Sequence, residues 1–382
     1  MASGARPWLN EDVTTIRNGK LAIDGELIER DLHITDGFIA EESADDEVID
    51  ATGMIVSPGL IDIQINGGFG HDFTQDPTTI WEVGRLLPEL GVTAFVPTIV
   101  TSPDAVTDLA LDVVANRRPE DYVGAEVLGL HFEGPWISPD RHGAHNRDHI
   151  VDPNIDVAEK WAQSGLVRIV TLAPERPHAA EVAEMLAAAG VVVSIGHSDA
   201  NYETARDSLS GPASLGTHLF NQMSPFTHRR PGVVGALLLS GRPAIVIVDG
   251  LHIAAGALEL AWRMLGPERT VLVTDAMAAL GLGPGTYPLG DGPITVGEDG
   301  PRTSDGRLAG SVGTLPEAVS NLAETTGASI AEALLGATAN PARVLGLEDR
   351  GHLRVGHRGE IVVFDNSLQP MKTLLAGKVV DL

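Results

Sequence analysis

The chain contains no cysteine among its 382 residues. A disulfide framework, a thiolate nucleophile and a thiolate metal ligand are therefore excluded, because each of them needs a cysteine sulfur. Any metal ion that this protein binds must rest on histidine and carboxylate side chains. The absence of cysteine thus limits the possible metal ligands and nucleophiles to other residue types.

Basic residues are also scarce. The chain has 26 Lys and Arg against 52 Asp and Glu, which gives a formal net charge of −26. Binding to nucleic acid needs a basic stripe facing the phosphate backbone, so we expect no nucleic-acid partner. The same negative field would repel a small phosphorylated ligand at long range, and such a ligand would need local cationic groups at its binding site.

Long apolar runs are missing as well. Runs such as residues 244–248 are far shorter than the roughly 20 residues that cross a bilayer, and residues 1–10 lack the apolar core of a secretory signal. We therefore expect a cytoplasmic protein with no membrane partner. Hydrophobic residues make up 43% and charged residues 20% of the chain, which is typical of a globular protein and not of a disordered one.

Three common catalytic signatures are absent too: the G-x-S-x-G elbow of serine hydrolases, the G-x-x-x-x-G-K-[ST] phosphate loop, and a G-x-G-x-x-G run after a strand. What the sequence does contain is an alternation. Short β-branched, apolar runs alternate with helix-like stretches, two of which, residues 177–189 and 253–265, carry apolar residues at helical spacing. This pattern predicts βα units around a parallel sheet.

We count eight such runs, which predicts closure into an α/β fold of the TIM-barrel type, (β/α)8. The predicted strands cover residues 59–65, 92–98, 127–131, 167–172, 191–195, 214–219, 244–248 and 271–274. The alternation is interrupted by the glycine-rich segment 281–300, which we expect to be a mobile surface loop.

The two ends of the chain have a different pattern. Residues 13–55 and 351–381 contain short alternating runs and turns, which are typical of β structure. Neither end offers enough strands for a stable sheet by itself, so we expect them to pair into a small β-sandwich beside the barrel. The predicted domains are residues 1–56 with 351–382 for the sandwich and 57–350 for the barrel.

Polar residues gather at the carboxyl ends of the predicted strands, the face on which TIM-barrel enzymes carry their active sites. Glu133, His197 and His218 each follow a different strand, so closure of the barrel would bring them together. Two imidazoles and one carboxylate leave a coordination position open for water, as in a catalytic metal site. Any one of them alone would more often be a hydrogen-bonded loop residue, but their equivalent positions favour the metal site.

Asp275 ends the eighth predicted strand and would face the same cavity. A carboxylate there suits general acid and base catalysis, although an isolated Asp after a strand is more often a helix cap. Nearby loops carry side chains suited to an anion, because Arg binds phosphate in bidentate geometry and His adds a donor. This second group comprises His145, Asn221, Arg229, Arg230 and His252, of which the arginine pair could also be an ordinary solvated surface.

Seven strings of the sequence resemble those of the N-acetylglucosamine-6-phosphate deacetylases of the amidohydrolase superfamily. They occur in the family's order: PGLIDIQING at residues 58–67, HFEGP at 131–135, GAH at 143–145, GHS at 196–198, THLFN at 217–221, DGLH at 249–252 and TDA at 274–276. The resemblance implies a (β/α)8 barrel with a β-sandwich built from both termini, a homodimer, and removal of the acetyl group from a small amino-sugar phosphate.

The resemblance also implies roles for individual residues. Glu133, His197 and His218 match the metal ligands, Asp275 matches the catalytic acid and base, and His145 matches the residue that polarises the acetamide carbonyl. The implied contacts to the sugar phosphate are Asn221, the backbone N–H of Gln222, Arg229 and His252, with Arg229 or His252 able to act across a dimer interface.

The sequence departs from the family at the first strand. Many amidohydrolases carry a His-x-His pair there, where this chain has Gln64 and Asn66. Neutral amides are poor ligands for a transition metal, so we predict one divalent ion per subunit, zinc first and iron, manganese or cobalt as alternatives. Two other functions stay open: another amidohydrolase reaction, such as cyclic-amide opening or nucleobase deamination, and a catalytically silent scaffold on the same fold.

Overall fold

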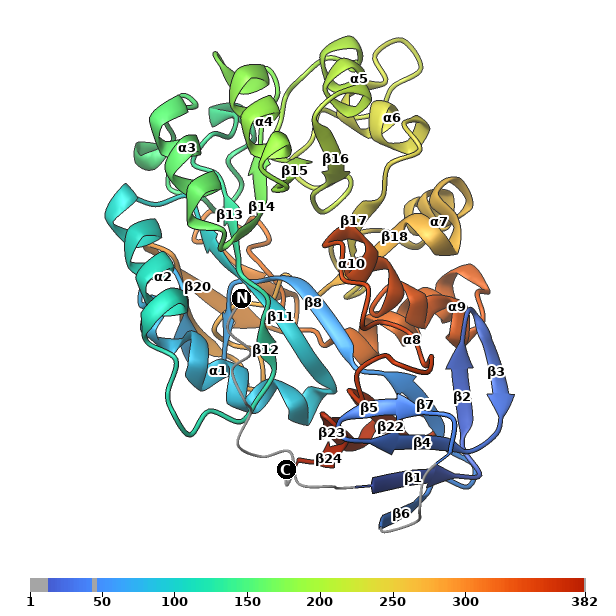
Figure 1. The fold of residues 1–382 in the computed structure, drawn as a ribbon. Coiled ribbons are helices and arrows are strands. Elements are labelled where there is room, and N and C mark those ends of the chain that lie inside the picture. The colour runs from blue at the N-terminus through green and yellow to red at the C-terminus, as the bar shows by residue number, and fades with distance from the viewer. Residues whose placement is uncertain (1–12, 43–46, 381–382) are drawn as a thin grey trace.

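The structure is a computed structural model that describes residues 13–42 and 47–380 (Figure 1). The prediction about residues 1–10 and the outermost residues of the predicted sandwich lie outside the described residues. No helix in the described part of the chain combines the length and the apolar character needed to cross a membrane.

Eight parallel strands form a nearly closed barrel, which confirms the predicted fold class. The backbone N–H of Asp275, after the last strand, donates to the carbonyl oxygen of Gln64 at the end of the first at 2.9 Å, so these two strands meet. The barrel strands, in order, are β8 (Leu60–Ile65), β11 (Val92–Val100), β13 (Leu130–Glu133), β14 (Val167–Leu172), β15 (Val192–Ile195), β16 (Ala213–Gly216), β17 (Ala244–Ile247) and β18 (Thr270–Val273).

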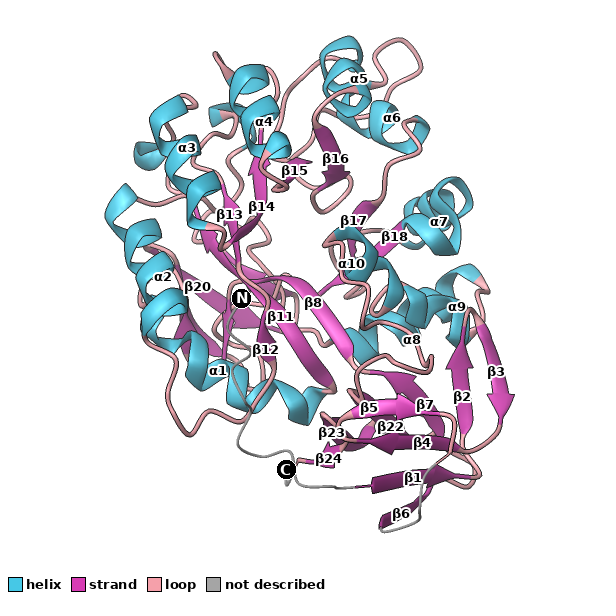
Figure 2. Cartoon of the chain, in the orientation of Figure 1, coloured by secondary structure: helices cyan, strands magenta, loops and turns pink. Residues whose placement is uncertain are grey.

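Helices cover the outside of these strands (Figure 2). Because both faces of a barrel strand are covered, its residues are apolar almost throughout, and every residue of β8, β11 and β17 is buried. The helices are α1 (Ile80–Leu86), α2 (Asp104–Asn116), α3 (Ile155–Ser164), α4 (Ala179–Ala188), α5 (Tyr202–Ser210), α6 (Gly232–Leu239), α7 (Ala255–Arg269), α8 (Leu315–Thr326), α9 (Ile330–Leu335) and α10 (Ala339–Val344).

Strands from both ends of the chain form two sheets that share one apolar core, as predicted, and they lie together below the barrel in Figure 1. The first sheet contains β5 (Phe38–Ala40), β4 (Leu32–Thr35), β1 (Val13–Arg17) and β6 (Glu47–Asp50). The second contains β24 (Lys378–Val379), β23 (Pro370–Leu375), β22 (Ile361–Phe364), β7 (Ile55–Pro58), β2 (Lys20–Ile23) and β3 (Glu26–Glu29). The domain limits at residues 56 and 350 stay predictions.

Short elements complete the fold. They are the hairpin β9 (Gly67–Gly68) and β10 (His71–Asp72), the strand β12 (Glu126–Val127), and the 3₁₀ turns η1 (Pro77–Thr79), η2 (Leu87–Leu90), η3 (Pro139–Arg141) and η4 (Arg147–His149). The third barrel strand had been predicted at residues 127–131, which is wrong at both ends. Gly129 has a φ of +127° and interrupts the run, so the strand continues from Leu130 to Glu133.

The segment 281–300 is not a loop. Most of it belongs to an antiparallel sheet of β19 (Gly285–Leu289), β20 (Gly292–Gly297) and β21 (Gly300–Arg302). Its buried side chains Leu289, Ile294 and Val296 pack against Met277, just beyond β18. The loop prediction is wrong because the many glycines obscured the alternation of Ile294 and Val296, which have the spacing of a strand with one buried face.

Candidate active site

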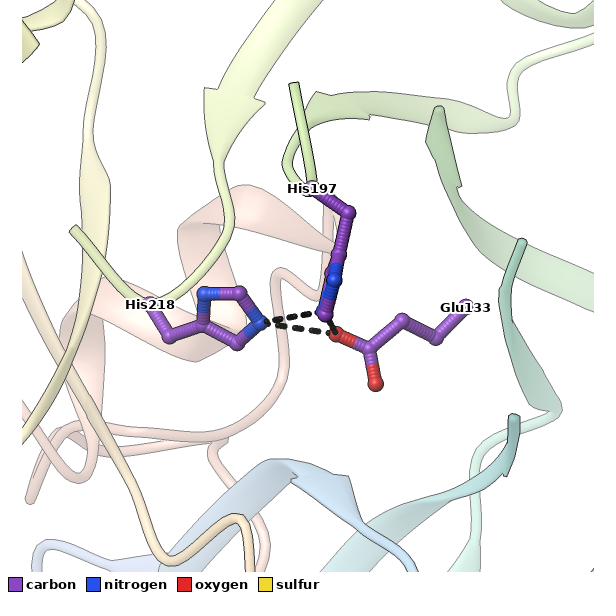
Figure 3. A group of neighbouring side chains, drawn as sticks. All are labelled: Glu133, His197 and His218. Carbon is purple, nitrogen blue, oxygen red and sulfur yellow. Dashed lines mark hydrogen bonds and ion pairs between the residues drawn. The ribbon is translucent and has the colours of Figure 1, made fainter. Parts of the chain in front are cut away.

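Three strands end at a single point inside the barrel mouth. Glu133 is the last residue of β13, and His197 and His218 each follow their strand by two residues. Figure 3 shows the three side chains pointing toward one another. Glu133 Oε1 lies 2.9 Å from His218 Nε2 and 3.3 Å from His197 Nε2, and the two nitrogens are 3.0 Å apart. In the described ranges this is the one group of three or more such side chains able to hold a metal ion.

These donor atoms fit a divalent ion. Neighbouring ligands in a tetrahedral shell with bonds of about 2.0–2.1 Å lie about 3.3 Å apart, close to the separations found here. His197 Nδ1 lies 2.8 Å from the carbonyl oxygen of Arg141, which can only accept, so Nδ1 carries the proton and the lone pair of Nε2 faces the group. Burial opposes ionisation of Glu133, but His197 and His218 beside it hold the pKa of its carboxyl well below the usual range.

The backbone at these strand ends is unusual. His197, His218 and Asp275 have φ values of 48°, 28° and 49°, in or near the left-handed region that non-glycine residues rarely adopt. Such a conformation costs about 1–3 kcal/mol for each residue and persists only where the surroundings enforce it. The chain here is held from both sides: for example, Ser311 N donates to Asp275 O at 2.9 Å. Strain of this kind is common at active sites.

Asp275 lies beside the Glu133 group and is held by the two amides of the first strand. Asn66 Nδ2 donates to Asp275 Oδ1 at 2.8 Å, and Gln64 Nε2 donates to the same oxygen at 3.2 Å and to Glu133 Oε1 at 3.1 Å. Burial, followed by the charge of Glu133, raises the pKa of Asp275 to about 6. The amides thus fix one oxygen of Asp275, while Oδ2 makes no hydrogen bond within the described residues.

His145 adds a hydrogen-bond donor. The backbone N–H of Thr101 donates to His145 Nδ1 at 3.3 Å, so Nδ1 bears a lone pair and the ring proton is on Nε2. His145 Nε2 lies 3.7 Å from Glu133 Oε2. Burial and the neighbouring His197 lower the pKa of His145 to about 3, which keeps the ring neutral. A neutral imidazole with its N–H at the metal group can donate to a carbonyl oxygen.

The predicted phosphate contacts are less uniform. His252 has a side chain only 6% exposed and is bonded to Asp249 at 2.7 Å, whereas Gln222, which follows β16, is half-buried and packs beside Gly143, two residues before His145. Arg229 lies in the exposed stretch 225–230, and its side chain makes no hydrogen bond or ion pair with the part of the chain that the structure describes. The structure therefore brings the catalytic candidates together, whereas Arg229 lies on an exposed stretch of the chain.

A family model described as "Amidohydrolase family" matches residues 55–380. The chain belongs to the amidohydrolase family. This amidohydrolase is 39% identical to the N-acetylglucosamine-6-phosphate deacetylase of Bos taurus, over 96% of this chain and 95% of that one, and 34% identical to that of Bacillus subtilis, over 98% and 97%.

Solved structures give the same result. The amidohydrolase matches the N-acetylglucosamine-6-phosphate deacetylase of Pasteurella multocida with a TM-score of 0.91 and 28% identity, over 97% of this chain and 100% of that one. It matches the enzyme of Mycobacterium smegmatis, solved as a mutant in complex with N-acetyl-D-glucosamine-6-phosphate, with a TM-score of 0.88 and 30% identity, over 97% and 99%. The recognition made from the seven strings is thereby confirmed.

Sequence reasoning missed several residues that shape this amidohydrolase site. Thr101 and the carbonyl of Arg141 fix the protonated nitrogens of His145 and His197 through backbone atoms, for which a sequence has no signal. Asp249 did have one, because it opens the string DGLH, but its contact with His252 depends on how the turn closes. These residues act on the functional side chains and not directly on a ligand.

Proposed function

We propose that this amidohydrolase hydrolyses the acetamide bond of N-acetylglucosamine 6-phosphate to give glucosamine 6-phosphate and acetate. Relatives carrying that activity in their names match nearly the whole chain at 34–39% identity. The observation that carries the proposal is the convergence of Glu133, His197 and His218 within 2.9–3.3 Å of one another, beside Asp275, at the barrel mouth.

We assign one divalent ion per subunit to Glu133, His197 and His218, with zinc before iron, manganese or cobalt. When bound, such an ion lowers the pKa of a water to roughly 7 and polarises the substrate carbonyl. Gln64 and Asn66 support a single ion, because neutral amides are poor ligands for a transition metal and their N–H groups donate to Asp275 and Glu133.

Asp275 is the proposed acid and base. Its Oδ1 is occupied by Asn66 and Gln64, so Oδ2 is the oxygen available to take a proton from the attacking water and to deliver it to the departing nitrogen. As the carbonyl oxygen gains negative charge, the Nε2–H of His145 donates to it. Because the His145 ring is neutral and held at Nδ1 by Thr101, this donor is already oriented before the reaction.

At the other end of the substrate, the proposed contacts to the sugar phosphate are Asn221, Gln222, Arg229 and His252. These loops supply the local donors and the positive charge that a protein of net charge −26 needs for a phosphorylated ligand. The exposed position of Arg229 supports a homodimer in which this residue serves the neighbouring subunit. A cytoplasmic location belongs to the same proposal, since the reaction consumes a phosphorylated sugar.

The two rival functions are weaker. Cyclic-amide opening and nucleobase deamination fit the barrel. The relatives named above, however, are deacetylases, and they match this chain along almost their whole length. A silent scaffold would have lost its ligands, whereas Glu133, His197 and His218 are all present and converge.

The test is an acetate-release assay on N-acetylglucosamine 6-phosphate after removal of metal and stepwise addition of zinc, iron, manganese and cobalt. We expect activity to disappear on removal and to return with one equivalent of ion per chain. Equal activity on unphosphorylated N-acetylglucosamine, or activity only on cyclic amides, would contradict the proposal. His178→Ala, which changes an exposed histidine on the surface, is the control.

A further inference from the structure

Asp249 follows β17 by two residues and directs both carboxylate oxygens at the turn that ends in His252. Its Oδ1 accepts from the backbone N–H groups of Leu251 and His252, each at 2.9 Å. Its Oδ2 lies 2.7 Å from His252 Nδ1. The two side chains are 9% and 6% exposed, so this pair is shielded from solvent.

The pair determines which nitrogen of His252 carries a proton. Burial opposes ionisation of Asp249, but the hydrogen bond and charge of His252 hold the pKa of that carboxyl below its usual value. An ionised carboxylate only accepts, so His252 Nδ1 must donate to it. The nitrogen left for a ligand is therefore Nε2.

The ring of His252 lies near the carboxyl of Asp275: burial raises the pKa of that carboxyl, and the charge of His252 is among the influences that lower it. A carboxylate behind an imidazole orients the ring and stabilises its protonated form, as in catalytic triads. With protons on both nitrogens, His252 would meet a phosphate oxygen with a charge-assisted hydrogen bond, whereas with Nδ1–H alone the lone pair of Nε2 would face the anion.

We propose that Asp249 is a positioning residue that holds His252 with a proton on Nδ1 and places a carboxylate charge behind the ring, and thereby sets the affinity of the site for the phosphate group of the substrate. The inference rests on the proposed function, since it deepens the role of the phosphate end. In this role Asp249 acts through His252.

Asp249→Asn separates this role from a merely structural one. The amide oxygen can keep both backbone N–H groups of the turn, so the turn is retained, but the amide N–H₂ then faces Nδ1 of His252. Because that group only donates, Nδ1 must bear a lone pair, and the proton of the ring moves to Nε2. One atom is exchanged, and the preferred protonation of His252 is reversed.

The first measurement is steady-state kinetics on the holoenzyme. We expect Asp249→Asn to raise KM for N-acetylglucosamine 6-phosphate about 10-fold, the difference between a charge-assisted and a neutral hydrogen bond, with kcat changed less than threefold. Inhibition by glucosamine 6-phosphate should weaken by the same factor, and inhibition by glucosamine should not change. Equal weakening of both inhibitors, or a fall in kcat with unchanged KM, would overturn the proposal.

The second measurement is ¹⁵N NMR of the imidazole, with the His252 signals identified by their loss in His252→Ala. We expect Nδ1 to be protonated in the unchanged protein and unprotonated in Asp249→Asn; identical spectra would refute the positioning role. Asp50→Asn is the control, because Asp50 also accepts from a backbone N–H of its own turn, that of Thr52 at 3.1 Å, and lies at the end of β6 in the terminal sheets. If the unchanged enzyme releases no acetate, the proposed function and the phosphate role fail together, while the NMR experiment still decides the protonation of His252.

Discussion

The two ends of the candidate site are built differently. At the proposed catalytic end, Glu133, His197, His218 and Asp275 are at most 8% exposed and are hydrogen-bonded to residues from other parts of the barrel. Among the proposed phosphate contacts only His252 is comparably buried, and Arg229 lies on an exposed stretch without a bonded partner among the described residues. Strand ends can hold reacting groups rigidly, whereas loops leave part of ligand binding to be completed by the substrate or by a second subunit.

The largest expected effect comes from the catalytic end. Asp275→Asn keeps the size of the side chain but removes the group that exchanges protons, so kcat for acetate release should fall by about 10²–10⁴-fold with little change in KM. Steady-state assays of the metal-loaded enzyme test this. A loss smaller than 10-fold would show that Asp275 is not the acid and base, and that the rigid end of the site was wrongly assigned.

The next prediction concerns the support beneath that end. Asp62 is fully buried, accepts from Thr274 Oγ1 at 2.5 Å, and burial raises its pKa from 3.8 to about 7. The folded protein therefore holds this proton more tightly than the unfolded chain does. Its stabilising contribution is complete below pH 4 and is lost as the pH rises to 7, by up to about 4 kcal/mol in the free energy of unfolding.

Asp62→Asn should remove this loss. Urea denaturation at pH 5 and pH 8 should show that the variant gains stability relative to the unchanged protein at the higher pH. Parallel behaviour of the two proteins would mean that Asp62 is not a buried, protonated group. Asp62 would then not contribute to the rigidity of the catalytic end.

Arg229→Ala tests the phosphate end. A hydrogen bond to a charged group contributes about 1.5–3 kcal/mol, so KM for N-acetylglucosamine 6-phosphate should rise by roughly 10–100-fold while kcat changes little. His228→Ala, on the same exposed stretch, is the control. An unchanged KM would leave Arg229 as an ordinary surface residue.

A mixing experiment shows which subunit supplies the arginine. If Arg229 acts across a dimer interface, a hybrid of one Arg229→Ala subunit and one Asp275→Asn subunit contains one complete site and regains activity. If Arg229 acts within its own subunit, the hybrid gains nothing over its parents.

The smallest effect is expected in the sheet of β19, β20 and β21, which contacts the loop that carries His145. Asp291, in the turn between β19 and β20, accepts from Asn146 Nδ2 at 2.9 Å and from His149 Nε2 at 2.8 Å, and so holds the loop that carries His145. The carboxylate is 56% exposed, so its removal should cost no more than about 1 kcal/mol.

Asp291→Ala should therefore lower kcat by only about two- to fivefold. Asp299→Ala, in the next turn of the same sheet, is the control and should have no effect on acetate release. A loss above 10-fold would show that the His145 loop depends on this sheet as much as on the barrel. The catalytic end would then not be held by the barrel strands alone.

Elements with a strong local signal in the sequence were predicted correctly, and elements with a weak signal were missed. The eight strands were found because a β-branched, apolar run between two helical stretches is seldom anything but a buried strand, and the fourth was predicted with the bounds of β14, Val167–Leu172. The sheet formed by β19, β20 and β21 was missed, because its strands are short, rich in glycine and only half-buried. Gly129 likewise displaced the third strand, since its positive φ is a property of the folded backbone.

What the sequence alone determined is the fold class, the family and the residue types at each strand end, because hydrophobic spacing and short motifs are local properties of the chain. Only the tertiary structure decided that Glu133, His197 and His218 meet within 3.3 Å, that Thr101 and Arg141 fix the protons of two imidazoles, and that Asp249 directs His252. Distances, protonated nitrogens and shifted pKa values depend on groups that are far apart in sequence, and barrel closure is the step that brings these groups together.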